Sequence, residues 1–207
     1  FLSSDIKTKH SVTYFLKTIT DNFDKSKTNI NLYFNHKKSQ GDNTTEEFKG
    51  SVDKAVYIDH LSDEEAINLI REDKNDILID LMGVTSKSRL SLIKNRVAPV
   101  QILWCGYCNT TGIQEMDYIL ADKNLIFENE KNLYTEKIIY LPKIWNCHSG
   151  INLERNFTDS PIKKNDYITF GSFNNFSKIN DAVINTWSKI IKSIKNSRLI
   201  LKTSNLK

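Results

Sequence analysis

Apolar residues recur along this chain at two spacings, every second residue and every third or fourth residue, which are typical of strands and helices respectively. Short apolar runs predict strands at residues 30–34, 55–59, 77–81, 100–104, 118–121 and 138–141. Phe1 and Leu2 are interpreted as the end of an earlier strand. Helical spacing follows it, with apolar side chains on one face at Val12, Phe15, Leu16, Ile19 and Phe23. The alternation predicts an α/β fold with an open, mostly parallel sheet.

Two further helices are predicted between the strands. Ser62 and Glu65 form the pattern of a capping box, and the acidic residues between them suit the positive start of a helix. Residues 88–94 are interpreted as a short helix. The polar stretch at residues 36–50 is assigned no element.

A domain boundary is predicted between Trp145 and Asp166, because Gly, Pro, Asn and Asp interrupt the apolar pattern there. We place it after residue 155, so that residues 1–155 form a first domain and residues 156–207 begin a second. The second contains one strand–helix–strand unit, at residues 167–173, 182–194 and 199–201. One such unit cannot cover both faces of its own sheet, so we expect the chain to stop inside the second domain.

The charge balance excludes several classes of protein. The 207 residues include 29 Lys plus Arg and 25 Asp plus Glu, a net charge of +4, and the lysines are scattered along the chain. Nucleic-acid-binding proteins gather basic residues on one face, so no nucleic acid partner is expected. No run approaches the ~20 apolar residues that cross a bilayer, so no membrane partner is expected either. The chain begins at Phe1 without an initiator Met, which we interpret as the start of a fragment.

The cysteines indicate a reducing compartment. Their odd number, three, argues against a disulfide framework and favours the cytoplasm. Cys105 and Cys108 form a C-x-x-C pattern, and Cys147 precedes His148, so a zinc site is one interpretation. No second closely spaced pair accompanies them, and small buried thiols are the favoured interpretation.

Four segments together resemble the catalytic region of a known enzyme family. They are SSDIKTKHSVTYFL at residues 3–16, DILIDLMGVTSKSR at 76–89, APVQILWCGYCNTTG at 98–112 and FNNFSKI at 173–179. Their order and spacing are similar to those of the protein O-GlcNAc transferases, a family that includes the plant SPINDLY proteins. The resemblance implies a GT-B fold, in which two facing Rossmann-like domains hold a sugar nucleotide between them. It also implies that the first domain is nearly complete, that the second is only begun, and that tetratricopeptide repeats can precede the pair.

Sugar transfer sets the chemistry that these residues have to perform. A leaving diphosphate must be stabilised, and the acceptor hydroxyl must lose a proton. In a metal-independent enzyme, cationic side chains and amides at helix starts stabilise the diphosphate, so we expect no metal and no cofactor apart from the UDP-sugar substrate. Lys178 lies between strand 167–173 and helix 182–194 and matches the family lysine that contacts the diphosphate. Asn174 and Asn175 match amides that line the nucleotide pocket; a loop asparagine that bonds its own backbone is the alternative.

His10 is the second residue to which we assign a catalytic role. It follows the first strand and matches a family histidine beside the diphosphate and the acceptor, where it would donate a hydrogen bond or carry a proton. Asp5, in the same segment, is expected to orient the loop. Arg71 stands where many members of the family carry a histidine discussed as the catalytic base. Arginine cannot act as a base near neutral pH, so that role is not transferred.

The loop after strand 100–104 is the third part of the expected site. Thr110, Thr111 and Gly112 carry hydroxyls and amides that are expected to hold the acceptor or a phosphate. Cys108 and Asn109 replace the Pro-Gly of the family pattern, which removes a rigid φ and a glycine able to adopt positive φ. Asparagine tolerates positive φ better than most residues.

The resemblance therefore implies an inverting glycosyltransferase that moves a sugar, with GlcNAc favoured, from a UDP-sugar to Ser or Thr hydroxyls of a protein. Residues 1–155 would form the acceptor side and residues 156–207 the start of the nucleotide-sugar side. Because the C-terminal half of the second domain is missing, we expect this chain to be inactive alone. The alternatives are a catalytically degenerate scaffold protein of the same fold and a UDP-sugar transferase with a different acceptor.

Overall fold

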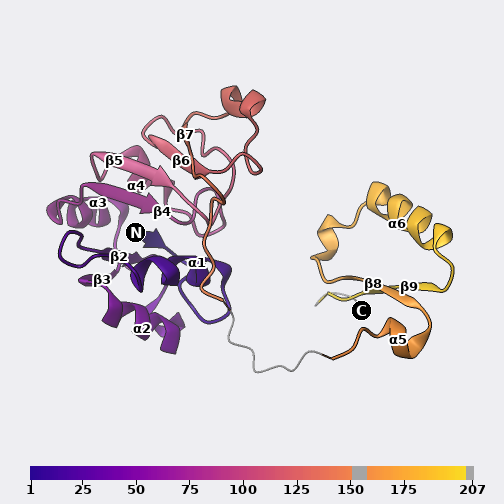
Figure 1. Ribbon diagram of the computed structural model, residues 1–207. Helices are drawn as coiled ribbons and strands as arrows, with labels where there is room; N and C mark the ends of the chain where they lie inside the picture. Colours follow the sequence, from indigo (N-terminus) through magenta and orange to yellow (C-terminus); the bar gives the residue numbers. More distant parts are fainter. Residues whose placement is uncertain (151–157, 204–207) are drawn as a thin grey trace. The chain divides into compact units, whose positions relative to one another are not determined.

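The computed structural model describes residues 1–150 and 158–203 (Figure 1). The chain divides into two compact units, Phe1–Asn152 and Leu153–Lys207. The boundary predicted after residue 155 lies outside the described residues.

Within the described residues, the first unit contains one sheet of seven parallel strands. They are β1 (Leu2–Ser3), β2 (Asn31–Phe34), β3 (Lys54–Tyr57), β4 (Ile77–Asp80), β5 (Val100–Leu103), β6 (Tyr118–Ala121) and β7 (Lys137–Tyr140). Their spatial order is β3-β2-β1-β4-β5-β6-β7. The chain therefore proceeds from β1 to one side and then, from β4, to the other. The predicted α/β class with a parallel sheet is confirmed.

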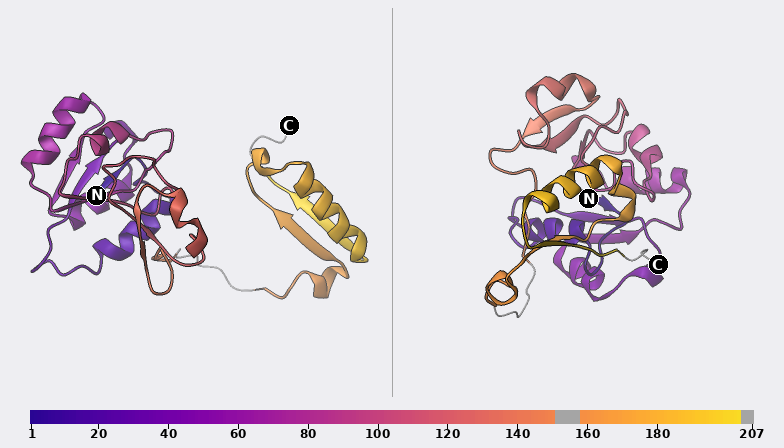
Figure 2. Two further views of the ribbon diagram at one scale, coloured as in Figure 1. Left: turned by 90° about the horizontal axis from the view of Figure 1, so that it is seen from above. Right: turned by 90° about the vertical axis from the view of Figure 1, so that its right-hand side faces the viewer.

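Helices cover both faces of this sheet (Figure 1, Figure 2). They are α1 (Ser11–Thr20), α2 (Asn43–Ser51), α3 (Asp63–Glu72) and α4 (Leu90–Lys94), with 3-10 turns η1 (Lys38–Gln40) and η2 (Glu128–Leu133). Leu32 and Phe34 of β2 pack with α1 and α2, whereas Tyr33, between them, packs with α3 and α4. This alternation follows from the two-residue period of a strand and explains why β2 is apolar on both faces.

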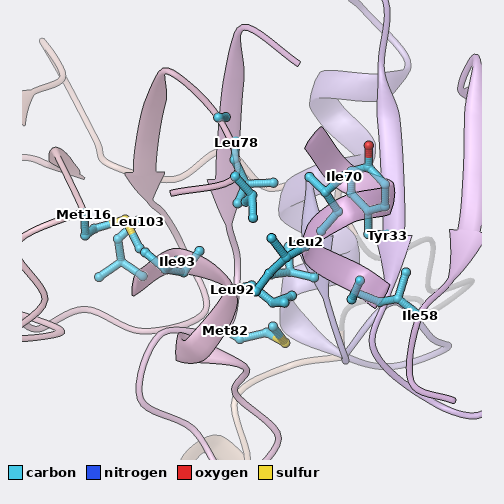
Figure 3. Packing of buried hydrophobic residues seen from close by; sticks show 14 of the residues in the cluster. Leu2, Tyr33, Ile58, Ile70, Leu78, Met82, Leu92, Ile93, Leu103 and Met116 are labelled. Atoms are coloured by element: carbon cyan, nitrogen blue, oxygen red, sulfur yellow. The ribbon is translucent and has the colours of Figure 1, made fainter. Parts of the chain in front are cut away.

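The larger core lies between the sheet and helices α3 and α4. Figure 3 shows Leu2, Tyr33 and Leu78 from the strands beside Ile70 of α3 and Leu92 of α4. All five side chains are at most 1% exposed. Burial of this apolar surface is the main favourable term that holds the helices on the sheet.

Local signals in the sequence explain where two of these helices start. The capping box predicted for α3 is confirmed, since the amide of Glu65 donates to Ser62 Oγ and the amide of Ser62 donates to Glu65 Oε2. The polar stretch at residues 36–50, for which the apolar pattern predicts no element, contains η1 and α2. Asp42 caps α2, and Phe48 is the apolar residue of that helix that enters the core.

The second unit consists, in its described part, of α5 (Ile162–Asn165), β8 (Ile168–Ser172), η3 (Phe176–Lys178), α6 (Asp181–Ser193) and β9 (Ser197–Leu201). Strands β8 and β9 pair in parallel, with Ile168 opposite Ser197. The apolar side chains of α6 line a shallow groove with β9, yet no residue of this helix is buried. Phe173 is 73% exposed. None of the helices in the described ranges of either unit combines the length and the apolar character needed to cross a bilayer.

Candidate functional site

The carboxyl edge of the seven-stranded sheet holds a cavity of about 490 Å³. Its lining comes from the loop after β1 and the start of α1, the loop after β4, and Gly106 after β5. Strands β1 and β4 are neighbours from which the chain departs in opposite directions. Such a switch point is where open parallel sheets bind their ligands. A larger cavity, of about 660 Å³ and lined by Asn31, Lys54 and Asp76, lies at the amino edge, so we do not assign the site to it.

His10 lies in this cavity, as part of the loop between β1 and α1. It is the N-cap residue of α1 by its backbone angles, but its side chain makes no capping hydrogen bond. The ring atom Nε2 lies 3.7 Å from Asp5 Oδ1, which is beyond hydrogen-bond distance. Nδ1 is buried and has no hydrogen-bond partner among the described residues. A buried polar atom without a partner costs about 1–3 kcal/mol, and such atoms in native proteins often have a functional explanation.

Thr85, in the loop after β4, lines the same cavity and has a second unpaired atom. Its Oγ1 is buried and lacks a hydrogen-bond partner within the described part of the chain. A ring nitrogen and a hydroxyl can donate or accept hydrogen bonds, so side chains of these two kinds suit the hydroxyls of a sugar or the oxygens of a phosphate. Sequence reasoning missed Thr85, whose one signal is its place in the segment at residues 76–89.

Buried polar contacts fix the loop that carries Thr85. The carboxylate of Asp80, 1% exposed, accepts the amides of Met82 at 3.0 Å and Gly83 at 2.9 Å. Burial raises the pKa of Asp80 to about 6, against the opposing effect of these two amides. Asp80 therefore has a structural role at the end of β4, as expected for a strand-end carboxylate that is saturated by backbone donors.

The predicted loop residues Thr110 and Thr111 do not line the cavity that contains His10. Their hydroxyls donate to Glu136, at 2.7 Å and 2.5 Å respectively, and the amide of Thr111 donates to it at 2.7 Å. Gly112 adopts a φ of +72°, and Asn109 is not among the residues with positive φ. Positive φ thus occurs in this loop at Cys105 and Gly112 and not at the replaced Pro-Gly positions. A role in substrate binding for these three residues stays a prediction.

Asn174, Asn175 and Lys178 lie together in the turn between β8 and α6 of the second unit, and all three are exposed. Asn175 Oδ1 accepts the amide of Ser177 at 3.2 Å, which starts η3, and Asn174 Nδ2 donates to Ser172 Oγ at 3.3 Å. Asn180 caps α6, since its Oδ1 accepts the amide of Val183 at 3.0 Å. Lys178 therefore stands just before the positive end of a 13-residue helix, where an anion is stabilised.

Two other sequence features have structural explanations. Arg71, at the end of α3, donates to the backbone carbonyls of Asn95 and Arg96 at the amino edge of the sheet, opposite the edge that carries His10. Of the cysteines, Cys105 is buried, and burial raises the pKa of its thiol, whereas Cys108 is exposed. The expectation of buried thiols was therefore wrong for Cys108. No group of three or more metal-ligating side chains occurs among the described residues.

Comparison with known proteins gives a consistent set of similarities. Residues 1–152 match the family model described as Glycosyl transferase family 41. The chain is 34% identical over 208 residues to the "Probable UDP-N-acetylglucosamine--peptide N-acetylglucosaminyltransferase SPINDLY" of Hordeum vulgare, covering 98% of this chain and 22% of that protein. It is 27% identical over 172 residues to the "UDP-N-acetylglucosamine--peptide N-acetylglucosaminyltransferase" of Caenorhabditis elegans, covering 82% of this chain and 15% of that protein. The chain thus spans less than a quarter of the length of these relatives.

A solved structure is similar as well. The O-GlcNAc transferase mutant K341M of Thermobaculum terrenum superimposes with a TM-score of 0.89 at 29% sequence identity. The match covers 98% of this chain and 38% of that one. It supports the GT-B architecture expected for the chain.

Proposed function

Because the chain belongs to glycosyl transferase family 41, we propose that it forms part of an inverting glycosyltransferase that moves a sugar from a UDP-sugar to Ser or Thr hydroxyls of proteins. GlcNAc is the favoured sugar, since the relatives' names specify UDP-N-acetylglucosamine as donor and a peptide as acceptor. The odd number of cysteines, all of them free, supports a cytoplasmic location.

The observation that carries this proposal is the cavity at the switch point of the sheet, which both His10 and Thr85 line. A ligand rich in hydroxyls or phosphate oxygens suits the polar side chains of this lining. Such a ligand would reach the unpaired atoms His10 Nδ1 and Thr85 Oγ1 after a movement of the two loops, because both atoms are shielded from solvent.

The second unit supplies the complementary chemistry in this proposal. The ammonium of Lys178 and the start of α6 would stabilise the negative charge that develops on the diphosphate as the bond to the sugar breaks. Asn174 and Asn175 would contact the nucleotide. His10 would donate a hydrogen bond or carry the proton of the acceptor hydroxyl. Residues 1–155 would then be the acceptor side and residues 156–207 the start of the nucleotide-sugar side.

Substitution in the full-length protein tests the enzyme. Lys178→Ala should lower transfer from UDP-GlcNAc to a protein acceptor by about 100-fold or more, the usual effect of removing one electrostatic contact to the developing charge. Lys189→Ala is the matched control, because Lys189 is an exposed lysine in the middle of α6. Transfer that is unchanged by Lys178→Ala would overturn the assignment of Lys178.

Two alternatives predict other outcomes. A scaffold protein of the same fold would bind nucleotide sugar without transferring it, and a transferase with a different acceptor would act on small molecules or lipids but not on proteins. The replacement of the family histidine by Arg71 is only weak support for the scaffold protein. Arg71 contacts backbone carbonyls at the sheet edge opposite the one that carries His10.

Calorimetry tests one physical ground for the inactivity of this chain alone, the absence of nucleotide-sugar binding. We expect UDP-GlcNAc to bind a chain that is extended at its C-terminus and not to bind the present chain. Equal binding by both would show that the present chain already contains the nucleotide site.

A further inference from the structure

The start of α2 contacts the loop that carries His10, here called the His10 loop (residues 4–10). The amide of Thr8 in this loop donates to Asp42 Oδ2 at 2.7 Å. The hydroxyls of Thr8 and Thr44 lie 2.8 Å apart, within hydrogen-bond distance. Asp42 is 34 positions away from Thr8 along the chain, so these bonds join two separate elements across the carboxyl edge of the sheet.

Thr45 makes a third bond between the same two elements, and this one is buried. Its hydroxyl donates to the backbone carbonyl of Ile6 at 2.9 Å, and Thr45 is 0% exposed. The same hydroxyl accepts the amide of Asp42 at 3.1 Å, while Asp42 Oδ1 accepts the amide of Thr45 at 3.1 Å. The capping box of α2 is therefore also the surface to which the His10 loop is attached.

The His10 loop needs such an attachment because its backbone is strained. Lys9, the residue before His10, adopts a φ of +64°. This left-handed conformation costs a residue with a side chain about 1 kcal/mol or more, and it persists where surrounding contacts hold it. On its other side the loop is held by Thr13 of α1, whose hydroxyl accepts the amide of Lys7 at 3.0 Å. Asp42 holds the amide of Thr8, which lies between Lys7 and the strained residue.

The negative charge of Asp42 strengthens its hydrogen bonds from the amides of Thr8 and Thr45. Burial alone would raise its pKa, but the donors on Thr8, Thr44 and Thr45 hold the pKa below its ordinary value. The carboxylate is thus ionised at neutral pH. Its bond to an amide is charge-assisted, which makes it about twice as strong as a bond between neutral groups.

We propose that Asp42 is a positioning residue for His10, because its carboxylate fixes the amide of Thr8 and thereby the backbone that places the His10 ring in the cavity. This inference rests on the proposed function only for the role of His10 in transfer. The attachment itself is independent of that role.

Two substitutions separate this role from helix capping. Asn and Ser are good N-cap residues, so Asp42→Asn and Asp42→Ser keep the cap on α2. Asn retains one oxygen for Thr45 and turns an NH₂ group toward the amide of Thr8, whereas the single oxygen of Ser cannot serve both amides. Glu46→Gln is the matched control: it removes one acidic charge from the same helix at a side chain that is 61% exposed and paired with Lys49.

Structural readouts come first, since they require no activity. In the present chain, the Thr8 amide should exchange with solvent about tenfold faster in Asp42→Asn and Asp42→Ser than in the wild type, while exchange within α2 is unchanged. The nitrogen resonances of the His10 ring should shift in both variants. Glu46→Gln should change neither. Wild-type exchange at Thr8 and unchanged His10 resonances would overturn the proposal.

Kinetics of the full-length protein then test the consequence for transfer. Both Asp42 variants should lower kcat at least about tenfold, because small displacements of a catalytic group are costly, with the KM for UDP-GlcNAc changed less than about twofold. Faster Thr8 exchange with an unchanged kcat would refute positioning. A wild-type protein without transfer would refute the proposed function instead, and the exchange and resonance data would still decide whether Asp42 holds the loop.

Discussion

Gly106 lies directly against the carbonyl oxygen of Leu81, so that a β-carbon at position 106 would come within 1.6 Å of that oxygen. Leu81 follows β4 and Gly106 follows β5, and the two loops touch through their backbones at the carboxyl edge. Gly106 also lines the cavity that contains His10. The shape of the cavity at this point therefore depends on the absence of a side chain at position 106.

Gly106→Ala is expected to force the two loops apart. The added carbon meets backbone, which cannot move aside as a flexible side chain can, so we expect a loss of about 1–3 kcal/mol or more in the free energy of unfolding. Gly50→Ala is the control, because a β-carbon at position 50 of α2 meets nothing within 4 Å. Alanine there should stabilise the helix by about 0.5–1 kcal/mol. Urea denaturation measures both, and a Gly106→Ala variant as stable as wild type would contradict a close contact between Gly106 and Leu81.

The regular part of the fold could be predicted because its signals are local. The apolar runs of β2 and β4 and the Ser62–Glu65 capping box follow from neighbouring residues, and the structure contains all of them. The spacing of apolar residues could not predict helix α2, because a single apolar residue of this helix, Phe48, enters the core and one residue defines no period. Asp42 and Thr45 were a signal for its start, but their capping pattern pairs Asp with Thr instead of Ser or Thr with Glu.

Within the site, sequence could predict only the residues that lie in a recognisable family segment. His10 was expected to follow the first strand, and it lies in the loop after β1, where it lines the cavity. The contact of Thr110 and Thr111 with Glu136 was not foreseeable, because 25 or more positions separate these partners along the chain. The unpaired hydroxyl of Thr85 depends on packing around it, which no local pattern encodes.

Asp117 should make stability depend on acid pH. Its carboxylate accepts hydrogen bonds from both Nη atoms of Arg96, at 2.9 and 3.0 Å, and from the amide of Gln101 at 2.8 Å. The Arg96 guanidinium is the main cause that holds the pKa of Asp117 below its ordinary value. A lowered folded-state pKa contributes stability above the unfolded-state value, about 4, and this stability is lost as pH falls through the folded-state pKa.

Asp117→Asn should therefore lower the free energy of unfolding by about 1–2 kcal/mol at neutral pH, and the difference from wild type should shrink as the pH falls below about 4 toward the lowered folded-state pKa. The control is Asp21→Asn, which removes an exposed pair with Lys17 and should change stability by less than about 0.5 kcal/mol at any pH. Urea denaturation at several pH values measures the difference. A difference that persists unchanged into this acid range would show that ionisation of Asp117 does not contribute.

Glu136 should hold the loop that carries Thr110 and Thr111. The carboxylate is 3% exposed and accepts from the two threonine hydroxyls and one amide of that loop. In Glu136→Gln, the remaining oxygen can still accept the Thr111 amide, while the hydroxyls can turn to accept from the new NH₂ group. In Glu136→Ala, the buried amide and hydroxyls lose their acceptor.

We expect losses in the free energy of unfolding of about 1 kcal/mol for Glu136→Gln and about 2–3 kcal/mol for Glu136→Ala. Hydrogen exchange at the Thr111 amide should increase in the same order. Glu128→Gln, which changes a glutamate that is 73% exposed, is the control and should be neutral. If Glu136→Gln were as damaging as Glu136→Ala, the charge of Glu136 and not its acceptor geometry would hold the loop.

Thr85 should show opposite effects on stability and on activity. Because its buried hydroxyl has no partner among the described residues, Thr85→Val removes an unsatisfied group and should leave the free energy of unfolding unchanged or raise it by up to about 1 kcal/mol. Thr45→Val is the contrast: its equally buried hydroxyl bonds to Ile6 and Asp42, and its loss should cost about 1–3 kcal/mol.

If the Thr85 hydroxyl binds the sugar or phosphate, Thr85→Val should lower transfer by the full-length protein at least about tenfold despite this stability, since the ligand would lose a hydrogen bond. A Thr85→Val variant that is destabilised would mean that the hydroxyl has a partner in the folded chain, and a stable variant with unchanged transfer would remove Thr85 from the site.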